Sequence, residues 1–148
     1  MNRQEKIRYL SRYRNLEKEI TQKREQILKW KSEAEKVTTI LSDLPKAKSR
    51  EIEDRNAEIV AKMIDLHYEL NQDISTLIDL KKEIEGVISN LDNPSYRLLL
   101  TKRYIDCKKW ELIAVEMNYS YRGVHKIHKI ALDRLKCAHF SSIKDDIM

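Results

Sequence analysis

Glycine and proline are scarce in this 148-residue sequence, which contains only 2 of each. Sandwiches, barrels and doubly wound sheets need many tight turns built from these residues, so the shortage argues against all three fold types. Gly86 and Gly123 also stand far apart, and a phosphate-binding loop needs its glycines close together. The chain shows no catalytic arrangement of residues, and we expect neither an enzyme nor a cofactor.

Cysteines and long apolar runs are also few. Cys107 and Cys137 form no CxxC pair, so the sequence lacks the disulfide framework typical of small secreted proteins. No apolar run approaches the ~18 residues that read as a membrane span. We therefore expect a cytoplasmic protein that has no membrane partner.

Charge is abundant, because 36% of the residues are charged and the net charge is +5. Residues 1–41 carry 11 basic and 6 acidic side chains, whereas residues 51–93 carry 4 basic and 11 acidic ones. Residues 94–148 are basic again, with 11 basic and 6 acidic side chains. The acidic middle segment would repel nucleic acid, so a nucleic-acid partner is expected to meet the basic ends.

Two long heptad repeats precede the C-terminal third of the chain. Apolar residues recur in alternating steps of four and three from Tyr9 to Leu41 and again from Ile52 to Leu91. Pro45 interrupts the helical pattern between them, and such a short connection favours antiparallel packing. Residues 1–92 are therefore predicted to form an antiparallel coiled-coil hairpin.

Polar exceptions in the two repeats suggest a register. If Leu41 faces Ile52, the numbers of facing residues add up to 93, and Lys23 and Asp73 then fall in adjacent layers. One interpretation is that Lys23 pairs with Asp73 and fixes the register. The other is that both side chains extend to solvent.

Three short helices are predicted after the hairpin, at about 94–105, 110–117 and 121–136. Asn93 and Pro94 suit the start of the first helix, and Ser120 suits the cap of the last one. A helix, a turn at 118–120 and a basic helix form a helix-turn-helix arrangement. The predicted fold is thus all-α, with a hairpin at 1–92, a three-helix domain at 94–139 and a tail at 140–148. Inward positions of the last helix are Val124, Ile127, Ala131 and Leu135.

The outward face of the last predicted helix combines basic and aromatic residues. Arginine and lysine can donate hydrogen bonds to guanine in the major groove, and lysines around the helix can contact phosphates. The alternative is that these charges only solvate a small helical bundle. His125 and His128 lack a second pair of ligands, so we expect no metal site. The candidate DNA-binding residues are Tyr121, Arg122, His125, Lys126, Lys129, Lys108 and Lys109.

Residues 96–105 (YRLLLTKRYI), 110–120 (WELIAVEMNYS) and 124–132 (VHKIHKIAL) resemble region four of bacterial sigma factors. That region binds the −35 promoter element and the flap of RNA polymerase. The whole chain resembles small phage and prophage proteins of Gram-positive bacteria that are described as sigma-like or late-transcription regulators. The resemblance implies that apolar residues around 98–105 dock on polymerase and that four residues face the DNA bases, namely Tyr121, Arg122, His125 and Lys126.

The sequence departs from the sigma pattern in three respects. Asn118 stands where these turns often have glycine, although asparagine tolerates a left-handed backbone. Lys109 replaces the usual serine or threonine cap before Trp110. No counterpart of the region that melts the −10 element is visible, which favours an accessory factor over a complete sigma factor.

The function expected from the sequence is a sequence-specific DNA-binding transcription regulator of a bacterial host cell. Its expected partners are double-stranded DNA, RNA polymerase, and further copies of the chain in a homodimer or higher oligomer. One alternative is a phage DNA-packaging or scaffolding component that oligomerises through the coiled coil. Another is a coiled-coil adaptor whose basic tail binds an acidic protein.

Overall fold

A computed structural model describes residues 1–40 and 44–136, including the side chains of 1–36 and 44–136. The expected tail at 140–148 and the seam position Leu41 lie outside the described residues. The described residues form helices without strands, so the predicted all-α fold is confirmed. The helices are α1 (Arg3–Ile40), α2 (Lys46–Ser89), α3 (Pro94–Leu100), the π-helical turn η2 (Thr101–Ile105), α4 (Trp110–Met117) and α5 (Tyr121–Arg134).

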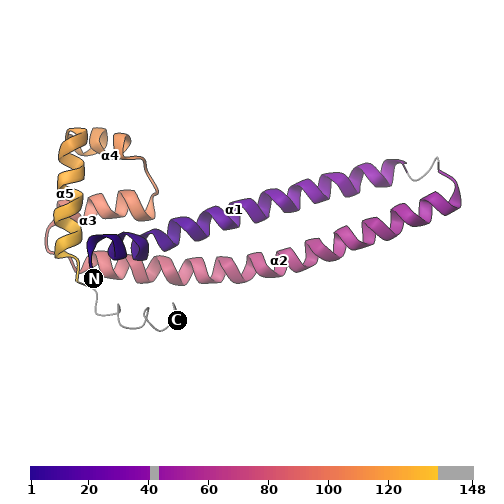
Figure 1. Cartoon of the computed structure of the whole chain (residues 1–148), viewed down its shortest axis with the longest axis horizontal. Helices are drawn as coiled ribbons and strands as arrows, with labels where there is room; N and C mark the ends of the chain where they lie inside the picture. Colours follow the sequence, from indigo (N-terminus) through magenta and orange to yellow (C-terminus); the bar gives the residue numbers. More distant parts are fainter. Residues whose placement is uncertain (41–43, 137–148) are drawn as a thin grey trace. The chain divides into compact units, whose positions relative to one another are not determined.

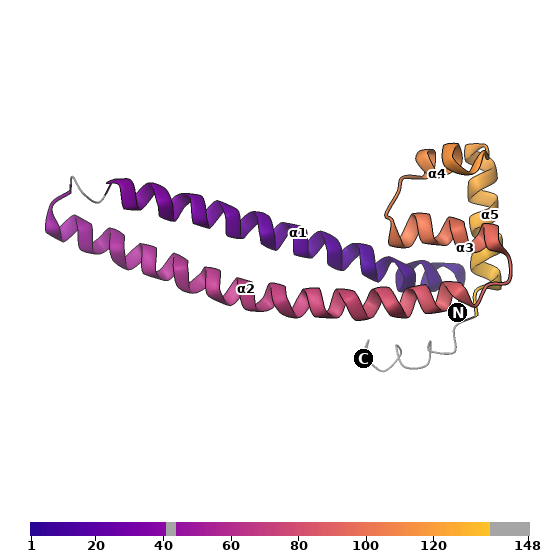
Figure 2. The same cartoon turned by 180° about the vertical axis from the view of Figure 1, so that it is seen from behind.

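Helices α1 and α2 run antiparallel and side by side, as the heptad repeats predict (Figures 1 and 2). The chain divides into two compact units that cut across both helices. We call residues Leu16–Leu77 the hairpin unit and Met1–Asn15 with Ile78–Met148 the C-terminal unit. Each unit therefore contains a segment of α1 and a segment of α2.

The core of the hairpin unit consists of predicted seam residues. Ile20, Ile27 and Leu70 are buried together. Leu16, Met63, Leu66, Ile74 and Leu77 pack against them. All but Ile74 belong to the predicted repeats, and the numbers of Leu16 and Leu77, or of Ile27 and Leu66, add up to 93 as the register requires. Ile74 follows Asp73, whose carboxylate occupies a seam position, and supplies apolar contact beside it.

Lys23 and Asp73 pair within this seam, which confirms the predicted pairing; that the pair fixes the register stays a prediction. The Lys23 Nζ lies 2.5 Å from Asp73 Oδ2 and 3.7 Å from Glu69 Oε2. The hydrogen bond to Asp73 is the main reason why the pKa of Lys23 is raised. About a quarter of each side chain is accessible, at 27% for Lys23 and 22% for Asp73, so water screens the pair partially.

Exchanging the two residues should be tolerated better than changing either one. Lys23→Asp or Asp73→Lys places like charges together, and we expect each to lower the free energy of unfolding by roughly 1 kcal/mol. The double exchange restores an attraction, and it is best made with Glu69→Gln so that the carboxylate introduced on α1 meets no second acid. Urea unfolding of the variants measures the effect. Equal losses in both single variants and in the exchange would mean that the pair does not set the register.

The core of the C-terminal unit joins the beginning of α1 and the end of α2 to the short helices. Leu10 of α1 and Ile84 of α2 are fully buried, as are Leu99, Ile113 and Leu132 of the following helices. Arg3 binds Asp133 through two hydrogen bonds of 2.7 and 2.6 Å, and Lys6 Nζ donates to the Leu132 carbonyl at 2.7 Å. The first turns of α1 therefore hold the C-terminal end of α5.

Capping residues set the boundaries of the short helices as predicted. Asn93 accepts a hydrogen bond from the Ser95 amide at 2.8 Å, and Ser120 accepts one from the Gly123 amide at 2.9 Å. Asn118 takes the left-handed conformation with φ of 58°, and Lys109 provides no side-chain cap. Two boundaries differ from the prediction: the helix predicted at 94–105 ends in the π-helical turn η2, and α5 ends at Arg134 because Leu135 is extended.

Candidate nucleic-acid interface

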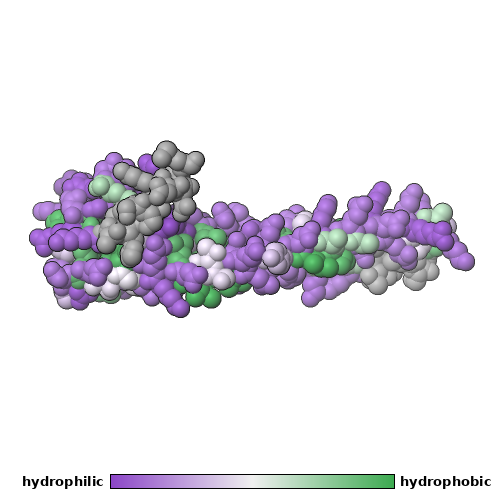
Figure 3. All heavy atoms as spheres, turned by 90° about the horizontal axis from the view of Figure 1, so that it is seen from below, coloured by the Kyte–Doolittle hydropathy of each residue, from purple (hydrophilic) through white to green (hydrophobic). Residues whose placement is uncertain are grey.

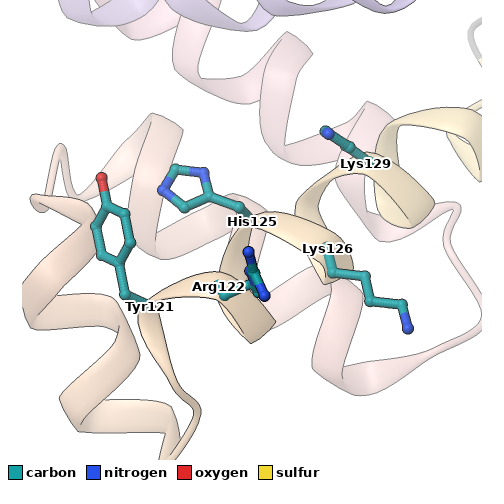
Figure 4. Close-up of a pocket in the computed structure, with 5 residues that line it drawn as sticks. All are labelled: Tyr121, Arg122, His125, Lys126 and Lys129. Atoms are coloured by element: carbon teal, nitrogen blue, oxygen red, sulfur yellow. The ribbon is translucent and has the colours of Figure 1, made fainter.

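Five of the predicted DNA-binding residues lie together on one surface of α5. Their spacing along the helix brings them around a shallow hollow of about 370 Å³ (Figure 4). Helix α5 packs against α3 and α4, which hold it in the C-terminal unit. The sequence prediction of a shared outward face is therefore matched by the positions of Tyr121, Arg122, His125, Lys126 and Lys129.

His125 is anchored between two aromatic rings. Its ring centroid lies 4.7 Å from that of Trp110 and 4.6 Å from that of Tyr121. His125 is half-buried as a result, whereas Tyr121 is 53% exposed. The Tyr121 and His125 side chains lie next to each other in Figure 4. An aromatic row therefore leads from α4 onto the surface of α5.

The basic side chains of this surface form no ion pair with an acid in the described part of the chain. Arg122, Lys126 and Lys129 are exposed, and none takes part in an ion pair found among the described residues. Asp133, the one acid of α5, binds Arg3, and this hydrogen bond lowers the pKa of its carboxyl. Among the described residues, no acid therefore neutralises the positive charge on the face of α5 that carries the hollow.

The lysines before α4 have different surroundings. Lys108 Nζ lies 2.9 Å from Glu116 Oε1, and Lys102 Nζ lies 2.6 Å from Glu116 Oε2. Hydrogen bonds from both lysines lower the pKa of Glu116. Lys109 is exposed and lies next to them in the chain. Of the two predicted lysine contacts, Lys108 is therefore partly neutralised by Glu116, and Lys109 is the more available cation.

A buried histidine–tyrosine pair holds α5 against η2, and the sequence did not reveal it. Tyr104 Oη lies 2.7 Å from His128 Nε2, and both residues are buried. Burial lowers the pKa of His128 to about 4 and raises that of Tyr104 to about 12. The spacing along α5 did indicate that His128 faces inward, because it lies four residues after the buried Val124.

The apolar segment that the resemblance assigns to polymerase is mostly internal. Leu99, Leu100, Tyr104 and Ile105 are buried in the C-terminal unit, and only Leu98 is substantially exposed, at 48%. These side chains belong to the core, because α3 packs against α5 and Tyr104 of η2 is hydrogen-bonded to His128 of α5. A polymerase contact at this segment would have Leu98 as its apolar residue.

Residues 47–136 match a family described as "Protein of unknown function (DUF1492)". The chain belongs to this family. The matched segment includes α3, α4 and α5 with the candidate surface, and most of α2. No curated protein and no solved structure matches the chain. Within the described residues, no helix has both the length and the apolarity needed to cross a membrane.

Proposed function

We propose that this DUF1492 protein is a non-catalytic regulator of transcription that binds double-stranded DNA through α5. The observation that supports the proposal is the basic surface at the beginning of α5, whose cations form no ion pair among the described residues, with aromatic side chains beside it. Helix α4, the turn at 118–120 and α5 have the sequence of elements found in helix-turn-helix modules. In such modules the first residues of the second helix contact base edges in the major groove.

Each residue of this surface has a chemical role in the proposal. Arg122 and Lys126 donate hydrogen bonds to the O6 and N7 acceptors of guanine. Tyr121 and His125 contact bases or phosphate with their rings and polar atoms. Lys129 and Lys109 bind backbone phosphates, and Lys108 contributes less because Glu116 already binds it.

The finer proposal is a sigma region-four-like accessory factor encoded by a phage or prophage and active in the host cytoplasm. The resemblance of residues 96–132 supports it, and the exposed Leu98 is its candidate contact to RNA polymerase. An accessory factor would bring polymerase and promoter DNA together without opening the duplex itself.

Self-association through the hairpin unit completes the proposal. Val60, Ile64 and Tyr68 of α2 follow one another at intervals of four and are 43%, 63% and 67% exposed. Hydrophobic groups reach the surface in separate patches on a largely hydrophilic face of the molecule (Figure 3). A dimer formed there would carry a second copy of α5, which lets the protein read two half-sites.

Selection of genomic DNA fragments by the purified full chain tests the proposed function. At near-physiological salt, nonspecific phosphate binding is strongly weakened, so retained fragments report the reading of sequence. Enrichment of a promoter-proximal site is the expected result. Recovery of random fragments, or of none, would contradict the proposal.

Two further readouts separate the alternatives in the same experiment. Enrichment of a packaging site together with a ring-sized mass in sedimentation would identify a packaging component. No DNA binding even at low salt would favour a coiled-coil adaptor with a protein partner. A dimeric mass together with enrichment of one promoter site would support the proposed regulator and neither of the two alternatives.

A further inference from the structure

A second hollow, of about 280 Å³, lies in the C-terminal unit between the first turns of α1 and the short helices. Its polar lining comes from Ser11 and Arg14 of α1, Arg103 of η2, and the rings of His125 and His128 on α5. No carboxylate belongs to this lining, so the described part of the chain provides the hollow with cations and no bound acid.

The two arginines of this hollow repel each other, and the hydrogen bonding of Arg14 is incomplete. The Nε of Arg14 is buried and finds no hydrogen-bond acceptor among the described residues. Arg103 is held in place, because its guanidinium lies 4.6 Å from the centre of the Trp110 ring and donates to the Lys108 carbonyl at 3.0 Å. Burial is the main reason why the pKa of Arg103 is lowered, and the positive charge of Arg14 lowers this pKa further. The charge of Glu111 raises it by a smaller amount.

An unpaired buried donor next to a second cation destabilises a fold unless a partner satisfies it. An acceptor with negative charge suits this donor best, since the hollow already holds two guanidinium groups. Arginine binds phosphate with two parallel N–H···O hydrogen bonds, which suits this pair. The hollow, of about 280 Å³, lies at the lower end of the ~300–1,000 Å³ range of small-molecule sites and has room for an oxyanion group.

We propose that this hollow is a binding site for one phosphate group, held by Arg14 and Arg103 with the Ser11 hydroxyl as a further donor. His128 adds no charge there at neutral pH, because burial lowers its pKa to about 4. The phosphate belongs either to a free phosphate compound or to the DNA backbone. The DNA backbone as the source rests on the proposed function. His125 supports this source, because its side chain lines both hollows.

Thermal unfolding of the full chain in sodium phosphate and in sodium chloride of equal ionic strength tests the site. Wild type and the control Arg8→Gln, an exposed arginine of the same helix, should gain about 4 °C in Tm when phosphate is tenfold above its Kd. Arg14→Gln should gain nothing, and Arg14→Lys, which keeps the charge without the Nε donor, should gain less than wild type.

The chloride arm separates binding from a structural role of Arg14. Without phosphate, Arg14→Gln should melt no lower than wild type, because the substitution removes a buried Nε donor that has no acceptor among the described residues. An equal gain in all four proteins would overturn the proposal. The proposal would also be overturned if the Tm of Arg14→Gln were below that of wild type by the same amount in chloride and in phosphate.

Calorimetric titration with inorganic phosphate, with and without a saturating selected duplex, identifies the source. A DNA phosphate in the site raises the apparent Kd for phosphate at least tenfold when the duplex is bound, whereas a site for a free compound keeps its Kd. If the chain binds no duplex, the proposed function fails while the phosphate-dependent gain in Tm still stands.

Discussion

Arg122→Ala and Lys126→Ala should each weaken binding to the selected DNA site by about 1–3 kcal/mol, or roughly 5- to 150-fold in Kd. Both side chains are exposed on α5 and lack an ion-pair partner among the described residues, so their removal leaves no buried group unpaired. Binding to a scrambled duplex should fall much less, because the lost contacts are to bases. Fluorescence anisotropy at fixed salt gives both affinities.

Two control variants distinguish base contacts from general charge. Lys129→Ala should weaken binding to both duplexes alike and reduce the slope of log K against log salt by about 1. Lys136→Ala removes an exposed cation outside the α5 surface and should leave the ratio of the two affinities unchanged. If Arg122→Ala and Lys126→Ala also left this ratio unchanged, α5 would not be the element that reads sequence.

Acidification from pH 6.5 to pH 4 should destabilise the C-terminal unit through His128. Its pKa is about 4 in the folded chain, below the ordinary value of 6.5, because the ring is buried and close to His125 and Arg103. Between these values the unfolded chain binds a proton that the folded chain does not, so stability rises with pH. The contribution is complete above pH 6.5, is lost as pH falls towards 4, and amounts to at most about 3 kcal/mol.

A double variant separates His128 from the acidic side chains that also titrate at low pH. Tyr104→Phe combined with His128→Phe replaces both partners of the buried hydrogen bond and leaves neither polar atom unpaired. Urea unfolding across pH 4–7 should give a flatter profile for this variant than for wild type. Parallel profiles would show that His128 does not titrate in this window.

The sequence was sufficient to predict the elements whose determinants are local or periodic. The heptad steps predict α1 and α2, and the register derived from them brings Lys23 next to Asp73, as the structure confirms. Asn93 and Ser120 mark the starts of α3 and α5 because each side chain accepts a hydrogen bond from an amide two or three residues later. The outward face of α5 follows from its 3.6-residue period.

Contacts between distant parts of the chain were not predictable in the same way. Helical periodicity assigns a residue to a face but does not identify the segment that covers this face. The bond between Arg3 and Asp133, and the approach of Arg14 to Arg103, join residues about 90 to 130 positions apart. The bond between Tyr104 and His128 was missed for a related reason, since periodicity does not identify the partner that satisfies a buried histidine.

Methylation interference on the selected duplex tests most directly whether α5 reads bases in the major groove. Methylation at N7 blocks the guanine acceptor that Arg122 and Lys126 are proposed to use. We expect methylation of particular guanines to abolish binding of the wild-type protein. Binding of Arg122→Ala or Lys126→Ala should no longer depend on methylation of one of these guanines. If modified phosphates interfered with binding and no methylated guanine N7 did, α5 would not read bases in the major groove.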